Sequence, residues 1–137
     1  GRTLLIHCEQ GLGDTLQFLR FLAPAQQKAG EGTVILAAQQ ILLPLLEQSG
    51  YTNLVPKEGA MPAFDVHLPL MSLPAVLGTT LDTLPREVPY LQADAERVAA
   101  WRSRLETGSG DVPTAQPQMR VGIAWQVRTN YRGDRLR

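Results

Sequence analysis

The chain has 137 residues, of which 44% are hydrophobic and 19% are charged. The apolar fraction excludes a disordered chain, and the length suits one domain with a real core. Its 13 Lys and Arg residues balance 13 Asp and Glu residues, which disfavours a generic nucleic-acid binder. The single cysteine, Cys8, excludes an internal disulfide and a multi-cysteine zinc site. No apolar stretch is long enough to span a bilayer, and we expect a cytoplasmic location.

Apolar segments predict strands at regular intervals along the chain. Residues 3–8 form a nearly continuous apolar run, which is typical of a strand buried on both faces of a parallel sheet. Similar patterns predict further strands at residues 33–37, 53–55, 65–68 and 119–125. Because these strands alternate with helical patterns, we expect an α/β, Rossmann-like three-layer domain with a mainly parallel sheet.

The first predicted helix runs from Asp14 to about residue 29. Asp14 is placed as its N-cap, with Gln17 three residues later as in a capping box, and Pro24 is expected to kink the helix or end it early. Further helices are predicted at residues 39–48, 70–77 and 94–106, with an irregular connector at 81–91.

Composition divides the chain into three parts. Residues 1–106 form the predicted Rossmann-like domain, and residues 107–118 form a flexible linker rich in Gly, Ser and Pro. Residues 119–137 hold the fifth strand and the beginning of a basic interdomain segment.

A glycine-rich loop follows the first predicted strand. Gly11 and Gly13 match the first two glycines of the dinucleotide-binding fingerprint, but Leu16 occupies the third position. The carboxylate of Asp14 also stands where a pyrophosphate would bind. Two unit charges about 4 Å apart repel by roughly 4 kcal/mol at an effective dielectric near 20. The loop therefore argues against a nicotinamide-dependent enzyme, and the chain has no Gly-Lys-Ser/Thr of a phosphate-binding loop.

The same loop suits a neutral, hydroxylated ligand. Glycines let the backbone approach a ligand closely, and a carboxylate can accept the proton of a sugar hydroxyl as its oxygen attacks an electrophile. Asp14 is therefore a candidate general base. The simpler interpretation of Asp14 is a helix cap paired with Gln17.

Other polar residues near the strand ends are weaker candidates. Gln10 is a candidate for acceptor binding, since neutral amides suit sugar hydroxyls. His67 is another, because it stands near the end of the fourth predicted strand, before Pro69, where it would face the cleft. His7 is interpreted as a core histidine and Cys8 as a buried, inert thiol beside Glu9. Two histidines without clustered carboxylates give no metal site, and no cofactor is expected.

Several segments resemble one known group of proteins. The string Gly11-Leu12-Gly13-Asp14 after a first strand resembles the start of the lipopolysaccharide heptosyltransferase family, whose GT-B fold has two Rossmann-like domains facing across a cleft. The wider pattern is similar to the glycosyltransferase-like region of bacterial tetratricopeptide-repeat proteins. It comprises residues 11–20, 64–70, 72–74, 77–83, 88–91 and 121–125, with Asp134 and Arg135 beyond.

The resemblance implies that the chain is the N-terminal, acceptor-side half of a GT-B glycosyltransferase. It carries Asp14 over as the general base of an inverting, metal-independent transfer, with Gly11, Gly13, Gln10 and His67 binding a sugar acceptor. A nucleotide sugar would bind only through a C-terminal donor domain following Arg137, so the chain alone is expected to be inactive. The alternative is a non-catalytic binding or scaffold module of a repeat-containing protein.

Overall fold

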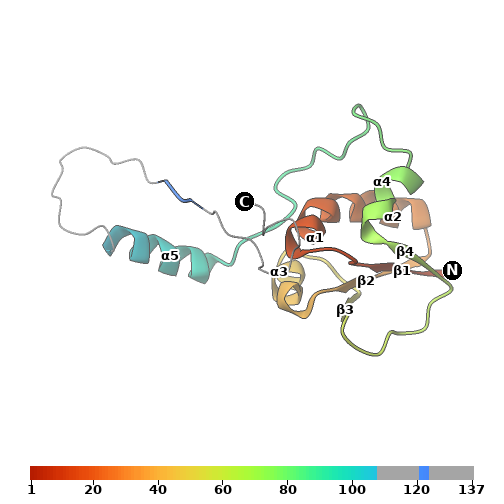
Figure 1. Cartoon of the computed structure of the whole chain (residues 1–137), viewed down its shortest axis with the longest axis horizontal. Helices are drawn as coiled ribbons and strands as arrows, with labels where there is room; N and C mark the ends of the chain where they lie inside the picture. Colours follow the sequence, from red (N-terminus) through yellow and green to blue (C-terminus); the bar gives the residue numbers. More distant parts are fainter. Residues whose placement is uncertain (108–120, 124–137) are drawn as a thin grey trace, which may run out of the picture. The chain divides into compact units, whose positions relative to one another are not determined.

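The computed structural model describes residues 1–107 and 121–123. Its centre is a four-stranded sheet formed by β1 (Thr3–His7), β2 (Thr33–Ala38), β3 (Leu54–Pro56) and β4 (Val66–Pro69). All pairings are parallel, and the strand order is β3-β2-β1-β4 (Figure 1). The structure therefore confirms the predicted strands in this part of the chain, with ends shifted by one residue or so.

Strand β1 lies in the middle of the sheet and fixes its register. Leu5 pairs with Ile35 of β2 on one side and with His67 of β4 on the other. Leu5 and Ile6 are buried, as a strand with neighbours on both edges requires. Every strand runs in the same direction, so the carboxyl ends of all four meet at one edge of the sheet.

The first predicted helix is divided in two. Helix α1 covers Leu12–Phe18, a short 3-10 turn η1 covers Leu19–Phe21, and helix α2 covers Leu22–Ala29. Pro24 lies in the first turn of α2, where the backbone N–H groups have no partner within the helix and proline is tolerated. The break therefore comes before the proline, as a 3-10 turn rather than a kink.

Prolines also mark the next two helical segments. After β2 the chain forms η2 (Gln40–Leu42) and α3 (Leu43–Gln48), and after β4 it forms η3 (Leu70–Ser72) and α4 (Leu73–Val76). Pro44 and Pro74 occupy the first turns of α3 and α4. Both segments thus begin with a tight turn and become α-helical at the proline, which is preorganised for the first turn of a helix.

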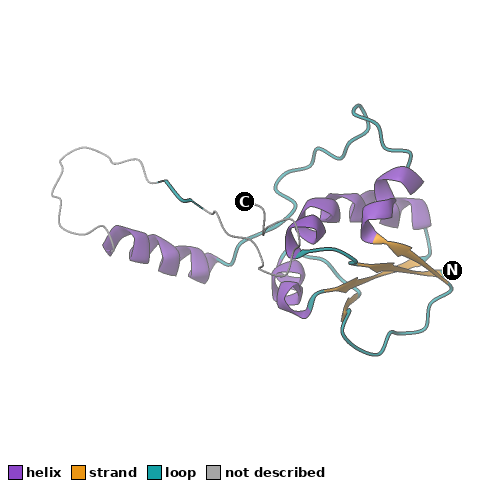
Figure 2. Ribbon diagram, viewed as in Figure 1, coloured by secondary structure: helices purple, strands orange, loops and turns teal. Residues whose placement is uncertain are grey.

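The core lies between the helices and one face of the sheet. Its largest fully buried hydrophobic side chains come from β1, η1, α3, η3 and α4: Ile6, Leu19, Leu46, Leu70 and Leu73. Figure 2 shows α1, α2 and α4 on one side of the sheet and the loop from β3 to β4 on the other. The predicted α/β, Rossmann-like three-layer class is confirmed, and here a loop forms the third layer.

The last described helix, α5 (Ala95–Thr107), matches the prediction for residues 94–106. Asp94 caps it, because its Oδ1 accepts a hydrogen bond from the backbone N–H of Arg97 at 2.8 Å. The structure divides into one compact unit at Gly1–Arg102 and another at Ser103–Arg137. None of the helices in the described ranges combines the length and apolar character needed to cross a membrane.

Two predictions concern the chain beyond α5. The predicted linker, 107–118, and most of the predicted fifth strand and interdomain segment, 119–137, lie outside the described residues. Residues 121–123 are described and have no regular secondary structure.

Candidate functional site

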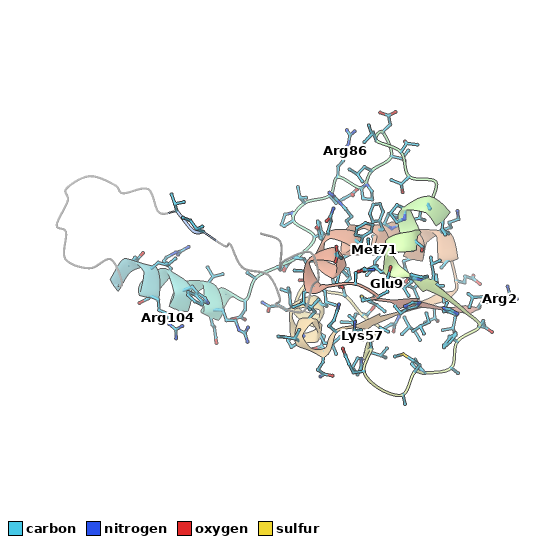
Figure 3. The ribbon with its side chains drawn as sticks, viewed as in Figure 1. Arg2, Glu9, Lys57, Met71, Arg86 and Arg104 are labelled. Carbon is cyan, nitrogen blue, oxygen red and sulfur yellow. The ribbon has the colours of Figure 1, made fainter. Side chains whose placement is uncertain are left out.

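The carboxyl edge of the sheet gathers polar side chains from loops that are distant in sequence. Glu9 follows β1, Gln39 follows β2 and Lys57 follows β3, while Leu70 and Met71, which follow β4, contribute backbone N–H groups. Figure 3 shows Glu9 beside Met71 at this edge. Ligands of open α/β sheets bind at such edges, so the side chains found there define the candidate site.

Asp14 contacts the glycine loop within its own helix. The N-cap of α1 is Gly11, and Asp14 is the third helical residue. Its Oδ2 accepts a hydrogen bond from the backbone N–H of Gly11 at 3.0 Å. The prediction that Asp14 is the N-cap is therefore wrong, because the cap lies one turn earlier, at Gly11. The carboxylate of Asp14 instead binds the backbone N–H of this cap residue, which has no side chain of its own. Within the described residues, no hydrogen bond to Oδ1 is found.

A second carboxylate occupies the start of the helical segment after β4. Glu9 accepts hydrogen bonds from two consecutive backbone N–H groups, that of Leu70 at 3.1 Å and that of Met71 at 3.3 Å. Unpaired N–H groups and the positive end of the helix dipole attract anions to such a terminus. Here the chain's own side chain provides the anion, and it ties the end of β1 to the start of η3.

The segment after β2 has a third carboxylate in the same role. Oε2 of Glu58 accepts a hydrogen bond from the backbone N–H of Gln40, the first residue of η2, at 3.3 Å. Each helical segment that starts at this edge is thus capped by an acidic side chain of the chain itself. A phosphate approaching any of the three termini would meet a carboxylate already in place, so the edge favours neutral or cationic ligands.

A buried hydrogen-bond network holds the loop before α1 in place. The hydroxyl of Thr15, which is 1% exposed, lies 3.0 Å from Oε1 of Gln39 and 3.2 Å from the carbonyl oxygen of Gly11. Nε2 of Gln39 donates to the carbonyl oxygen of Gln10 at 2.9 Å. Gln10 therefore contributes its backbone to the site, whereas the sequence suggested a role for its side chain.

Cys8 and Lys57 complete the edge between β1 and β3. Nζ of Lys57 donates to the carbonyl oxygen of Cys8 at 3.2 Å. Burial raises the pKa of the Cys8 thiol above its ordinary value of 9.0, and the Thr15 hydroxyl and the Lys57 ammonium offset only part of that rise. The thiol is therefore protonated at neutral pH and is a poor nucleophile, in line with its interpretation as buried and inert.

The two site glycines differ in what they leave room for. A Cβ at Gly11 would lie 3.3 Å from Oδ2 of Asp14, so a larger residue would press on the capping carboxylate. A Cβ at Gly13 would meet nothing within 4 Å. A Cβ at Gly11 would therefore displace the Asp14 carboxylate by a few tenths of an ångström, whereas a Cβ at Gly13 would project into open space.

His67 lies on the face of the sheet away from the helices. Its neighbours in β4, Val66 and Leu68, line a cavity with residues of α2 and α4, and successive side chains of a strand point to opposite faces. The His67 ring centroid is 5.6 Å from that of His7 and 5.8 Å from that of Phe64. The structure therefore groups His67 with other rings and shows no contact between it and Asp14.

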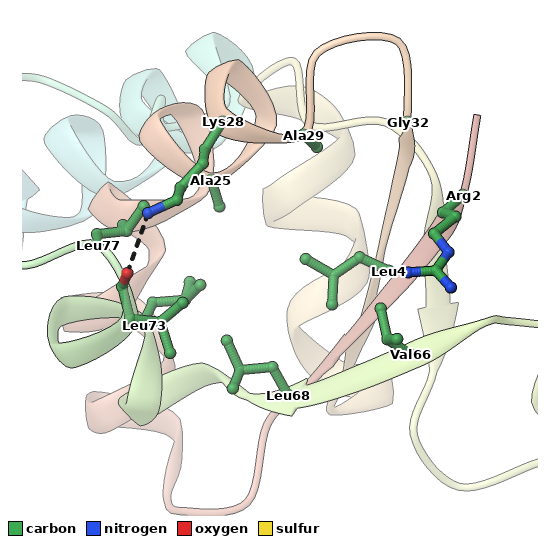
Figure 4. A pocket seen from close by; sticks show the side chains of 11 residues that line it. Arg2, Leu4, Ala25, Lys28, Ala29, Gly32, Val66, Leu68, Leu73 and Leu77 are labelled. Carbon is green, nitrogen blue, oxygen red and sulfur yellow. Dashed lines mark hydrogen bonds between the residues drawn. The ribbon is translucent and has the colours of Figure 1, made fainter.

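The cavity beside β4 lies toward the amino end of the sheet. It has a volume of about 260 Å³, and its walls are mainly apolar side chains of β1, β4, α2 and α4 (Figure 4). Nζ of Lys28 at its rim donates to the carbonyl oxygen of Val76 at 3.2 Å. None of the predicted site residues lines this cavity.

Thr15, Lys57 and Glu58 were not identified as site residues from the sequence. In the sequence, Thr15 has no feature that sets it apart from other helical residues. Lys57 and Glu58 fall in a segment for which the sequence predicts a loop and nothing more. The one available signal was the position of Lys57 and Glu58 just after a short predicted strand. In the described residues, no group of three or more His, Cys, Asp or Glu side chains is placed to hold a metal ion.

Comparison with known proteins gives one distant relative. The chain is 28% identical over 143 aligned positions to Protein FlbA of Caulobacter vibrioides. The alignment covers 92% of this chain and 23% of FlbA, so the chain spans about a quarter of that relative's length. The chain matches no known protein-family model, and no solved structure matches it.

Proposed function

We propose that this chain is the N-terminal, acceptor-side domain of a nucleotide-sugar-dependent glycosyltransferase, with Asp14 as its general base. The observation that carries the proposal is the acidic capping of the three helical segments at the carboxyl edge by Asp14, Glu9 and Glu58. The carboxylates at this edge repel phosphate groups. The same carboxylate and amide groups can form hydrogen bonds to the hydroxyl groups of a ligand. The resemblance of residues 11–14 to the heptosyltransferase loop supports the same assignment.

Three features of Asp14 support its assignment as the general base. It is only partly buried, it lies in the first turn of α1, and its Oδ1 has no hydrogen-bond partner among the described residues. The bond from Gly11 to Oδ2 fixes the orientation of the carboxylate. A carboxylate held in this way can take the proton of an acceptor hydroxyl placed beside Oδ1.

The proposed reaction needs a second domain for the donor. The acceptor hydroxyl loses its proton to Asp14, and its oxygen forms a bond to the anomeric carbon of the donor sugar. The bond between that carbon and the nucleoside diphosphate breaks on the opposite face, so the configuration inverts and the diphosphate leaves with the electron pair. Because proximity of both substrates supplies much of the rate, this chain alone is expected to be inactive. We place the reaction in the cytoplasm.

The test uses the longer protein that contains this chain, with a panel of saccharide acceptors and labelled nucleotide sugars. Asp14→Asn keeps an oxygen that can accept from Gly11 but removes the base, and should lower kcat by roughly 10²–10⁴-fold. Glu47→Gln is the matched control, because Glu47 is an exposed carboxylate on α3 away from the strand ends, and its turnover should equal that of the unaltered protein.

Two results would contradict the proposal. Unchanged turnover of the Asp14→Asn variant would remove Asp14 from the chemistry while leaving a transferase in place. Failure of the unaltered protein to bind any nucleotide sugar would favour the alternative, a non-catalytic binding or scaffold module.

A further inference from the structure

The two histidines of the chain meet on the face of the sheet away from the helices. His7 ends β1 and His67 lies in β4, 60 residues later in the sequence. Leu5 of β1 pairs with His67, and His7 lies two residues beyond Leu5, so both imidazoles are on the same face. Their ring centroids are 5.6 Å apart, and the ring planes are tilted by 41°. Strand pairing therefore brings together two possible metal ligands that are scattered in the sequence.

Both imidazoles have nitrogens available to a ligand. In residues 1–107 and 121–123, no hydrogen bond to a ring nitrogen of either histidine is found. The contacts of the two side chains are ring to ring, and Phe64 lies edge-on to His67 with centroids 5.8 Å apart. His67 is exposed and His7 is half-buried, so solvent reaches both residues. Neutral imidazole is the commonest metal ligand among protein side chains, which makes this pair a candidate metal site.

The spacing of the two rings fits one shared ion. A zinc–nitrogen bond of about 2.0–2.1 Å places each ring centroid about 3.2 Å from the metal, so two rings at a tetrahedral angle have centroids about 5.2 Å apart. The observed separation of 5.6 Å is a few tenths of an ångström longer. Rotation about the Cβ–Cγ bond, a soft torsion in histidine, turns the nitrogens and leaves the ring centroid in place. The spacing therefore allows both rings to bind one ion without a change in the backbone of β1 or β4.

We propose that His7 and His67 together bind one divalent ion of the late first-row transition metals, with Zn²⁺ as the expected occupant. Imidazole suits zinc, copper and nickel, whereas magnesium and calcium prefer oxygen ligands. The two histidines fill two of the four positions that zinc usually has, and water or a ligand from outside the described residues fills the others. The ion joins the edge strand β4 to the central strand β1.

This metal site is independent of the proposed transfer reaction. Asp14 lies in α1, which covers the opposite face of the sheet (Figure 2), and the reaction described above uses neither histidine. The ion is therefore not a part of the chemistry assigned to Asp14. Failure of either proposal leaves the other one standing.

The test follows the two imidazoles directly by NMR. The chain has two histidines in all, so a spectrum of the imidazole nitrogens contains one set of signals for each. The chain is titrated with Zn²⁺ at neutral pH and constant ionic strength, and with Mg²⁺ as the comparison ion. We expect both sets of signals to change together and to saturate at one Zn²⁺ per chain, and we expect Mg²⁺ to leave them unchanged.

Variants separate binding by two ligands from binding by one. His7→Gln and His67→Gln each leave a single imidazole and should weaken Zn²⁺ binding at least about tenfold, because the second ligand no longer acts at a high effective concentration. Zn²⁺ should raise the Tm of the unaltered chain more than that of either variant. Glu47→Gln is the control for binding to exposed carboxylates, because Glu47 is exposed on α3. It should bind Zn²⁺ as tightly as the unaltered chain.

Three results would overturn the inference. Imidazole signals that do not respond to Zn²⁺ would show that the rings only pack against each other. A response confined to one histidine would show that the pair does not share an ion. Equal Zn²⁺ affinity of the unaltered chain and His67→Gln would place the ion elsewhere. If His7→Gln does not fold, His67→Gln decides, because His67 is exposed and its loss leaves the core intact. None of these measurements depends on transfer activity, so failure here is distinguishable from failure of the glycosyltransferase proposal.

Discussion

Replacing Thr15 by Val tests whether the buried network holds the glycine loop of the candidate site. Thr15 is 1% exposed and Gln39 is 8% exposed, and the Thr15 hydroxyl lies 3.0 Å from Oε1 of Gln39. Valine has nearly the same shape as threonine but leaves Oε1 of Gln39 without this donor in a buried setting. An unsatisfied buried polar group costs about 1–3 kcal/mol, so we expect a loss of stability of that size. Each kcal/mol of lost stability lowers Tm by roughly 4–8 °C for a domain of about 100 residues, which is the size of the unit Gly1–Arg102.

The assay is urea unfolding of the chain followed by far-UV circular dichroism, with Thr15→Ser as the matched control. Serine keeps the hydroxyl and loses one methyl group, at a cost of about 0.8 kcal/mol before any cavity effect. A double-mutant cycle with Gln39→Leu isolates the pair, since replacing both partners by apolar groups can be nearly neutral. The reasoning fails if Thr15→Val is as stable as Thr15→Ser, or if the effects of Thr15→Val and Gln39→Leu simply add.

Two further predictions concern backbone packing and pH. A Cβ at Gly32 would lie 2.9 Å from the carbonyl oxygen of Arg2 and 3.0 Å from that of Ala29, so Gly32→Ala should cost about 1–3 kcal/mol in the same unfolding assay. Gly59→Ala is its control, because a Cβ there meets nothing within 4 Å, and equal effects at the two glycines would contradict the steric argument. Because burial raises the pKa of the Cys8 thiol, the folded state holds this proton more tightly than the unfolded state. That stabilisation is complete below the ordinary pKa of 9.0 and is lost as the pH rises through the folded-state pKa. The free energy of unfolding should therefore fall with pH in this range, less steeply for Cys8→Ala, and identical slopes would refute the assignment.

The glycine loop shows how far local sequence rules reach. The residues of the first turn of α1 were identified, but the sequence placed the cap at Asp14 and the structure places it at Gly11. Both residue types are common N-caps, and the choice between them depends on where the chain leaves β1. Pro24 shows a similar shift, because the sequence predicted a disturbance and packing placed the break in η1, three residues earlier.

The side chains that define the candidate site were harder to predict as a group. Glu9 and Leu70 are 61 residues apart in sequence and meet through one hydrogen bond. Gln40 and Glu58 meet across 18 residues in the same way. The sequence shows where each carboxylate lies along the chain. It does not show that the carboxylate caps a helical segment, because that contact forms only when the strand order brings two distant loops to the same edge of the sheet. For His67 the sequence predicted the strand correctly. It did not predict that His67 lies on the face of the sheet away from the helices.

The sequence by itself determined the class of this domain. Short apolar runs separated by helical patterns require a parallel sheet with its loops gathered at one edge, because parallel strands need long crossovers and buried strands need apolar residues on both faces. The tertiary structure alone decided the electrostatics of that edge. Charges and hydrogen bonds act over a few ångströms between residues that are far apart along the chain, so their pairing follows from strand order and register, which no local pattern encodes.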